Sequence, residues 1–108
     1  MPETRFHNGL SDAETERLAL LAEECAETGK AIGKILRHGY PSRNPDIADS
    51  PTNREDLEHE VGDLLWAIDL MAHCGDISML RSRADAGRHP RKTRYLHRQN
   101  HEGICQPC

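Results

Sequence analysis

Two pairs of acidic residues carry the side chains of this chain that are best suited to chemistry. Glu24 and Glu27 form one pair, and Glu60 and Asp63 form the other. Side chains three residues apart on a helix are neighbours on one face. The apolar residues around both pairs recur at helical spacing, so we expect each pair on a helix with a buried apolar side. Carboxylates there are costly unless a positive group meets them, which indicates a divalent cation or, alternatively, a solvated acidic edge with arginine partners.

Two helices that each carry such a pair can supply four carboxylates to one site. Mg²⁺ is a hard ion that prefers oxygen ligands, and it commonly joins carboxylates to the phosphates of a substrate. Two such ions a few ångströms apart can clamp the attacking and leaving oxygens and lower the pKa of a water. Four carboxylates at one site are therefore suited to holding divalent cations such as Mg²⁺.

The order of these acids resembles a known signature. Glu23-Glu24-x-x-Glu27 followed by Glu60-x-x-Asp63 is similar to the E-E-x-x-E and E-x-x-D motifs of the MazG-like, all-α nucleoside triphosphate pyrophosphohydrolases, over about residues 10–76. The resemblance implies hydrolysis of a nucleoside triphosphate, with deoxynucleotides and dGTP or GTP as candidate substrates, to a monophosphate and pyrophosphate. It also implies Mg²⁺ as the cofactor, with Mn²⁺ as its substitute.

Residue by residue, the resemblance makes Glu24, Glu27, Glu60 and Asp63 the metal ligands, and we assign Glu23 a supporting or water-positioning role among the catalytic residues. The 32 residues between Glu27 and Glu60 exceed the commonest spacing in the family. The excess falls in a proline-rich loop, which leaves the base specificity open.

Further side chains near the acids are candidates for binding the substrate. They are Lys30, Lys34, Arg37, His38 and Trp66. Lys30 and Lys34 follow Glu27 by about one and two helical turns and could neutralise a triphosphate, as point charges do elsewhere. The alternative is that both are ordinary solvated lysines. Trp66 could stack on a base, although its place among apolar residues favours a core position.

The elements that position these residues have clear local signals. Capping boxes at residues 11–14 and 52–55 predict the starts of two long helices, which end near residues 38 and 75. The proline-rich residues 40–51 between them are expected to form a loop that contributes a wall of a substrate pocket. We expect a short third helix over 77–86, capped by Asp76, and a last basic helix over 91–101.

These elements predict an all-α fold. Two antiparallel helices from one chain bury only part of their apolar surface, so we expect a second chain to complete a four-helix bundle. The resemblance likewise implies a homodimer or homotetramer. Cys25 and Cys74 fall beside apolar residues, and we expect them to be small core residues rather than reactive thiols.

The chain has 108 residues, which allows one domain, with residues 1–10 as an arm and 77–108 as a basic extension. Lys and Arg number 7 against 16 Asp and Glu up to residue 76, a balance of −9, and 7 against 2 from residue 77, a balance of +5. The alternative function is therefore a nucleic-acid-binding module that uses the basic extension. A separate zinc site is another possibility in the tail: His97, His101, Cys105 and Cys108.

The chain contains no apolar run long enough for a membrane span or a signal sequence. We therefore expect a cytoplasmic protein without a membrane partner.

Overall fold

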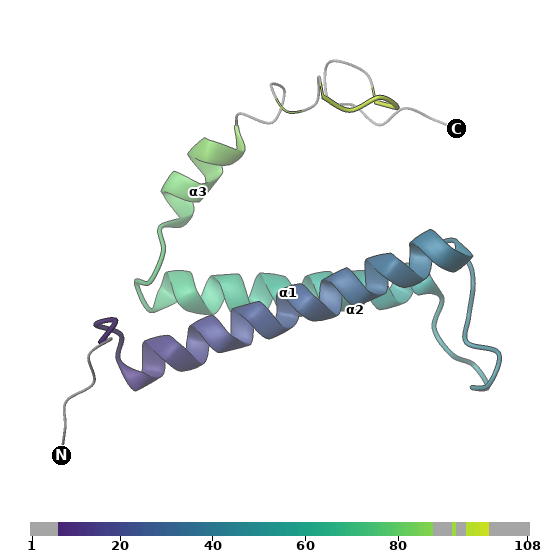
Figure 1. The fold of residues 1–108 in the computed structure, drawn as a ribbon, viewed down its shortest axis with the longest axis horizontal. Coiled ribbons are helices and arrows are strands. Elements are labelled where there is room, and N and C mark those ends of the chain that lie inside the picture. The colour runs from purple at the N-terminus through teal and green to yellow at the C-terminus, as the bar shows by residue number, and fades with distance from the viewer. Residues whose placement is uncertain (1–6, 88–91, 93–94, 100–108) are drawn as a thin grey trace. The chain divides into compact units, whose positions relative to one another are not determined.

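The computed structural model describes residues 7–87, 92 and 95–99. Within this part of the chain the structure consists of three helices and contains no β-strand: α1 (Asp12–His38), α2 (Asn53–His73) and α3 (Met79–Ala86). Figure 1 shows α1 and α2 lying side by side and joined by a loop. The predicted all-α fold is confirmed.

Both predicted capping boxes are present and set the starts of the two long helices. The backbone N–H of Glu14 donates to the Ser11 hydroxyl at 3.1 Å, and the Glu14 carboxylate accepts from the backbone N–H of Ser11. Thr52 and Glu55 make the same reciprocal pair at the start of α2. Each box satisfies backbone donors that the first turn of a helix leaves unpaired.

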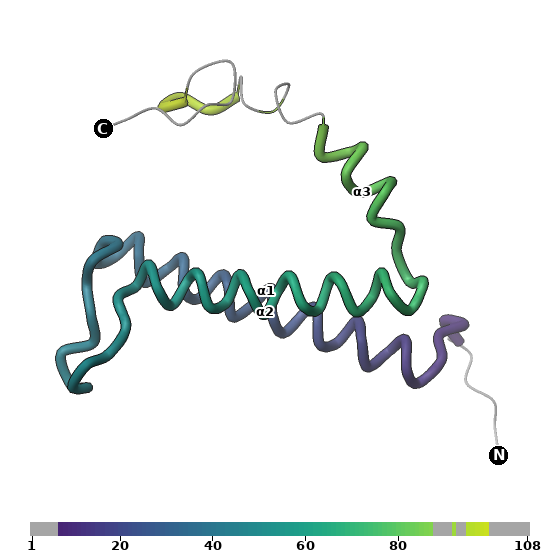
Figure 2. Tube along the Cα trace, turned by 180° about the vertical axis from the view of Figure 1, so that it is seen from behind, coloured from purple at the N-terminus to yellow at the C-terminus, as the bar shows by residue number. Residues whose placement is uncertain are grey.

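The two ends of the α1–α2 hairpin are fastened by polar contacts. At the loop end, the buried Asn53 side chain donates to the Gly39 carbonyl at 3.0 Å, and its backbone N–H donates to the Ser42 carbonyl. At the other end, the Arg17 guanidinium donates twice to the Asp76 carboxylate, a half-buried pair that lowers the pKa of Asp76. Figure 2 shows the same antiparallel path from behind.

Asp76 was expected to cap the third helix, and this prediction is wrong. The N-cap of α3 is Ser78, whose hydroxyl accepts from the backbone N–H of Arg81, so α3 begins two residues later than expected. Asp76 pairs with Arg17 instead, because a bidentate contact with a guanidinium is stronger than a cap contact with a neutral N–H.

The core of the hairpin is narrow. Its fully buried apolar residues in the described part are Ala31, Ala67 and Met71. Large apolar side chains on one side of the hairpin remain exposed: Leu18, Ile32 and Leu36 on α1, and Val61 and Leu65 on α2. We call these five residues the open apolar face. The apolar stripes that the sequence indicates are therefore divided between the helix contact and this face.

The expected core position of the two cysteines is wrong, because Cys25 and Cys74 are both exposed. Cys25 is seven residues, about two helical turns, before Ile32 and so lies on the open apolar face. Cys74 is the C-cap of α2 and so lies at the end of the hairpin.

The chain divides into two compact units, Met1–Asp76 and Ile77–Cys108. The second contains α3, which ends at Ala86 as expected and has Gly87 as its C-cap. The described residues 95–99 form a turn and bends rather than the predicted helix, whereas Lys92 of the same segment is helical. Tyr95 and Leu96 are exposed. The other residues of that segment, and His101, Cys105 and Cys108 of the zinc hypothesis, lie outside the described residues. In the described part, no helix has the length and apolar character that a membrane crossing requires.

Candidate metal and nucleotide site

Three carboxylates converge in the middle of the α1–α2 hairpin. Glu24 of α1 and Glu60 and Asp63 of α2 each offer an oxygen, and these oxygens lie within 4.8 Å of one another. All three residues are half-buried. We call them the acid cluster. Sites that hold a hard cation need several carboxylate oxygens at one point, and this group provides them.

Helical spacing explains why the acid cluster faces inward. Glu24 lies seven residues before the buried Ala31, and Glu60 lies seven residues before the buried Ala67. Seven residues are close to two helical turns, so each glutamate shares the inner face of its helix with a buried alanine. The small alanines let the helices approach, which brings carboxylates from both helices together.

The electrostatics of the acid cluster favour a cation. Partial burial and then the negative charges of Asp63, Glu23, Glu60 and Glu27 raise the pKa of Glu24. Every contribution acts against ionisation of Glu24, and a bound cation would act in the opposite direction. The donor set therefore fits a hard divalent ion.

The two other acids of the motif, Glu23 and Glu27, lie close to the acid cluster but outside it. Both side chains are exposed, and neither belongs to the group of oxygens within 4.8 Å among the described residues. Their charges nevertheless raise the pKa of Glu24. Glu23 and Glu27 therefore lie on the solvent-exposed side of α1 next to the acid cluster.

The same side of the hairpin carries polar residues of both helices. The Lys34 ammonium lies 3.6 Å from the Asp56 carboxylate, and the His59 imidazole lies 3.4 Å from that of Asp63. Lys30 is exposed one turn before Lys34. The hairpin therefore has a polar side, which includes these residues, opposite the open apolar face.

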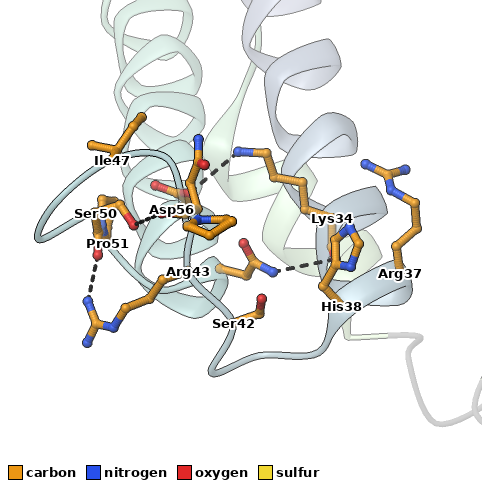
Figure 3. Close-up of a pocket in the computed structure, with 12 residues that line it drawn as sticks. Lys34, Arg37, His38, Ser42, Arg43, Ile47, Ser50, Pro51 and Asp56 are labelled. Atoms are coloured by element: carbon orange, nitrogen blue, oxygen red, sulfur yellow. Dashed lines mark hydrogen bonds and ion pairs between the residues drawn. The ribbon is translucent and has the colours of Figure 1, made fainter.

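A cavity of about 650 Å³ opens at the loop end of the polar side. Its lining comes from the end of α1, the loop and the start of α2: Lys34, Arg37, His38, Ser42, Arg43, Asn44, Pro45, Ile47, Ser50, Pro51, Asn53 and Asp56. Figure 3 shows Lys34 reaching from α1 toward Asp56, with the loop residues around them. The loop over residues 40–51 thus lines a cavity, as its sequence led us to expect. Three predicted substrate-binding residues, Lys34, Arg37 and His38, lie at this cavity.

Trp66 lies elsewhere on the hairpin. Its side chain is 57% exposed, so within the described chain it is not a core residue, contrary to the reading that its apolar neighbours favour. It follows Asp63 by three residues and lies on the polar side. Trp66 and the loop cavity therefore lie on opposite sides of the acid cluster along the helix axis.

Sequence reasoning missed Asp56 and Arg43. No role was assigned to Asp56 from the sequence, although it pairs with Lys34. Arg43 donates to the Ser50 carbonyl at 2.6 Å and so shapes the loop that lines the cavity. The sequence contains a weak indication for Asp56, because it precedes Asp63 by seven residues, about two helical turns, and so shares its face. No local signal marks Arg43.

The fold and site define an all-α protein with a carboxylate cluster inside a helical hairpin. A family model, the MazG nucleotide pyrophosphohydrolase domain, matches residues 13–84, and the chain belongs to this family. The match spans both hairpin helices, supports nucleotide pyrophosphohydrolase activity in general, and is consistent with a nucleotide substrate. Members of the family generally use divalent metals, which agrees with the acid cluster. The curated proteins and the solved structures give no significant match.

Proposed function

We propose that this chain is a Mg²⁺-dependent pyrophosphohydrolase that converts a nucleoside triphosphate, in particular a deoxynucleotide such as dGTP, to its monophosphate and pyrophosphate. The observation that carries the proposal is the convergence of Glu24, Glu60 and Asp63 within a chain of the MazG family. Water would supply the oxygen that bonds to the α-phosphorus, and the bond to the bridging oxygen of the β-phosphate would break. The proton of the water would pass to solvent.

The acid cluster would hold Mg²⁺, with Glu27 as a fourth ligand reaching in from the polar side. When bound, the ion would neutralise phosphate charge and make a water more acidic. Mn²⁺ takes the same oxygen ligands and would substitute. These assignments agree with the half-buried position of the acid cluster and with the raised pKa of Glu24.

The chain's own side chains would position substrate and water. Glu23 is exposed beside the acid cluster, where its carboxylate could accept a hydrogen bond from the attacking water. Lys30 and Lys34 would neutralise phosphate oxygens that the metal does not contact. Arg37 and His38 would extend this positive charge toward the loop cavity.

We propose further that the active form is a homodimer or homotetramer. The open apolar face would pack against the same face of a second copy and complete a four-helix bundle. Burial of such a face is favourable because it removes apolar surface from water. The acid cluster would stay accessible, because the polar side lies opposite. Residues 1–108 would form one domain with 77–108 as a basic extension.

The alternative function, nucleic-acid binding, has no specific observation in its favour among the described residues. Helix α3 carries Arg81 and Arg83, two of the seven cations of the basic extension. A basic stripe long enough to follow a phosphate backbone needs more cations than these two.

The proposal is tested by incubating the protein with each of the eight common ribo- and deoxynucleoside triphosphates, with and without Mg²⁺. We expect a monophosphate and pyrophosphate by ion-exchange chromatography, and no turnover when EDTA removes the metal. Diphosphate and inorganic phosphate as products would show a different reaction at the same site. No turnover of any nucleotide with Mg²⁺ or Mn²⁺ would refute the proposed function.

A further inference from the structure

Charge is distributed unevenly along α1 on the two sides of the acid cluster. From its start to Glu27 the helix has six acidic residues: Asp12, Glu14, Glu16, Glu23, Glu24 and Glu27. The single cation of that half is Arg17, which is engaged by Asp76. From residue 28 to its end the helix has Lys30, Lys34, Arg37 and His38 and no acidic residue. Along α1, an anionic chain leaving the acid cluster therefore meets repulsion in one direction and attraction in the other.

Compensation of the helix dipole does not explain the whole basic half. Cations are favourable in the last turn of a helix because they offset the partial negative charge there. The helix dipole therefore accounts for Arg37 and His38, which lie in the last turn. Lys30 and Lys34 lie before the last turn, and they face the polar side, where Lys34 meets Asp56. Lys30 and Lys34 therefore lie on the same side of the hairpin as the acid cluster, too far from the helix end for the dipole to account for them.

The loop cavity continues this basic half. Its lining includes Lys34, Arg37 and Arg43 but a single acid, Asp56. Asp56 is already partnered by Lys34. Arg43 uses one guanidinium N–H on the Ser50 carbonyl, and a guanidinium has five N–H donors in all. The cavity therefore presents a net positive lining, which suits phosphate oxygens better than a neutral base.

The opposite direction offers a different surface. Trp66 lies three residues, a rise of about 4.5 Å, beyond Asp63, and its indole is exposed on the polar side. On α1, Glu16 and Glu23 lie on that same side by helical spacing. Phosphates placed there would meet carboxylates, whereas the face of an uncharged base could stack on the indole.

We infer that the nucleotide binds in one orientation along the hairpin, with its base on Trp66 and its terminal phosphates in the loop cavity beside Lys34. This inference rests on the proposed function and adds the direction of the substrate to it. Asp56 precedes Glu60 by about one turn, so Lys34 lies within about 6 Å of the acid cluster along the axis, a reach suited to the phosphates beyond the α-phosphate. Stacking on a single ring accepts every base, so Trp66 contributes affinity without base selection.

Each of the two reaction products corresponds to one end of the bound nucleotide, so the two ends can be tested separately. A monophosphate carries the base, and pyrophosphate carries the terminal phosphates. We would measure binding of dGMP, dTMP and pyrophosphate in the presence of Mg²⁺ by isothermal titration calorimetry. The proteins are the wild type, Trp66→Ala, Trp66→Phe and Lys34→Gln. Arg54→Gln is the matched control, because Arg54 is a nearby positive charge that does not line the cavity and stacks on Tyr40, which does not line it either.

We expect Trp66→Ala to weaken both monophosphates about ten-fold and to leave pyrophosphate binding unchanged. Trp66→Phe retains an aromatic face and should restore most of the monophosphate affinity. Lys34→Gln should weaken pyrophosphate about ten-fold and leave the monophosphates unchanged, and Arg54→Gln should alter neither. Circular dichroism would establish that each variant is folded. Because more than half of Trp66 is exposed, we expect its substitution to leave the hairpin folded.

The reverse pattern, with Lys34→Gln weakening the monophosphates and Trp66→Ala weakening pyrophosphate, would overturn the inference and place the base in the loop cavity. Equal effects of both substitutions on all three ligands would also overturn it. Either result in a protein that hydrolyses nucleoside triphosphates would leave the proposed function intact. A wild-type protein that binds none of the products and hydrolyses no nucleotide would refute the proposed function, and this orientation with it.

Discussion

Ile32 offers the most quantitative test of the open apolar face. Its side chain is 44% exposed in the single hairpin. Burying a whole isoleucine side chain contributes about 1.5–3 kcal/mol, so covering the exposed part contributes about 0.7–1.3 kcal/mol per copy. Alanine retains a fraction of this area, and a symmetric interface counts the loss twice. We therefore expect Ile32→Ala to destabilise the dimer by about 1–2 kcal/mol, which is about a 5- to 30-fold weaker association.

The assay is sedimentation equilibrium across a range of protein concentrations, with Leu80→Ala as the matched control. Leu80 is 82% exposed and lies on α3, outside the open apolar face. We expect the control to associate like the wild type, because it removes a similar apolar side chain from a different surface. A well-folded monomer at micromolar concentration in the wild type, or equal effects of the two substitutions, would refute our reasoning about this face.

Three further predictions follow from particular contacts. Glu27→Gln should lower turnover less than substitutions within the acid cluster, as measured by steady-state kinetics, because Glu27 is exposed at its edge; complete loss of turnover would contradict this. Asp76→Asn should lower the thermal midpoint at pH 7. The pKa of Asp76 is lowered in the folded state, so its contribution is present above the ordinary carboxyl pKa and is lost as the pH falls through the lowered value; a midpoint difference that does not shrink as the pH is lowered would argue against the Arg17 contact as the cause. Ser11→Ala should cost about 1 kcal/mol in urea unfolding through loss of the N-cap, and an unchanged midpoint would show that α1 is held by other contacts.

The starts of the two long helices could be predicted because their signals are local. A capping box needs two residues three apart, and both the Ser11 and the Thr52 boxes form as the sequence indicates. The loop between the helices was equally clear, since its prolines exclude a continuous helix. The start of α3 was predicted wrongly, and Asp76 shows why. Its partner, Arg17, is 59 residues away, and no local spacing reveals such a pair.

The direction in which each helix faces its neighbour could not be predicted in full. Helical spacing shows which residues share a face, but both sides of this hairpin carry apolar residues. The partner helix packs on the line through Glu24 and Ala31 instead of the more apolar line through Ile32. Cys25 is therefore exposed, because it lies on that second line.

The convergence of acids was anticipated from the sequence more fully than the surrounding cavity. Glu24, Glu60 and Asp63 each belong to a short motif, and their motif positions already placed them near one another. The cavity depends on how the loop folds back, through contacts such as Arg43 to the Ser50 carbonyl. Such contacts are set by loop conformation, which residue spacing does not determine.

The central claim is that the acid cluster holds the metal that hydrolyses a nucleoside triphosphate. Its most direct test is the rate of pyrophosphate release at saturating Mg²⁺ in the wild type, in Asp63→Asn and in Asp69→Asn. Asp69 is an exposed acid of the same helix that lies outside the acid cluster, so it controls for the loss of one charge. We expect Asp69→Asn to turn over like the wild type and Asp63→Asn to be inactive while keeping its helical circular dichroism. Full activity of Asp63→Asn, or equal loss in both variants, would contradict the claim.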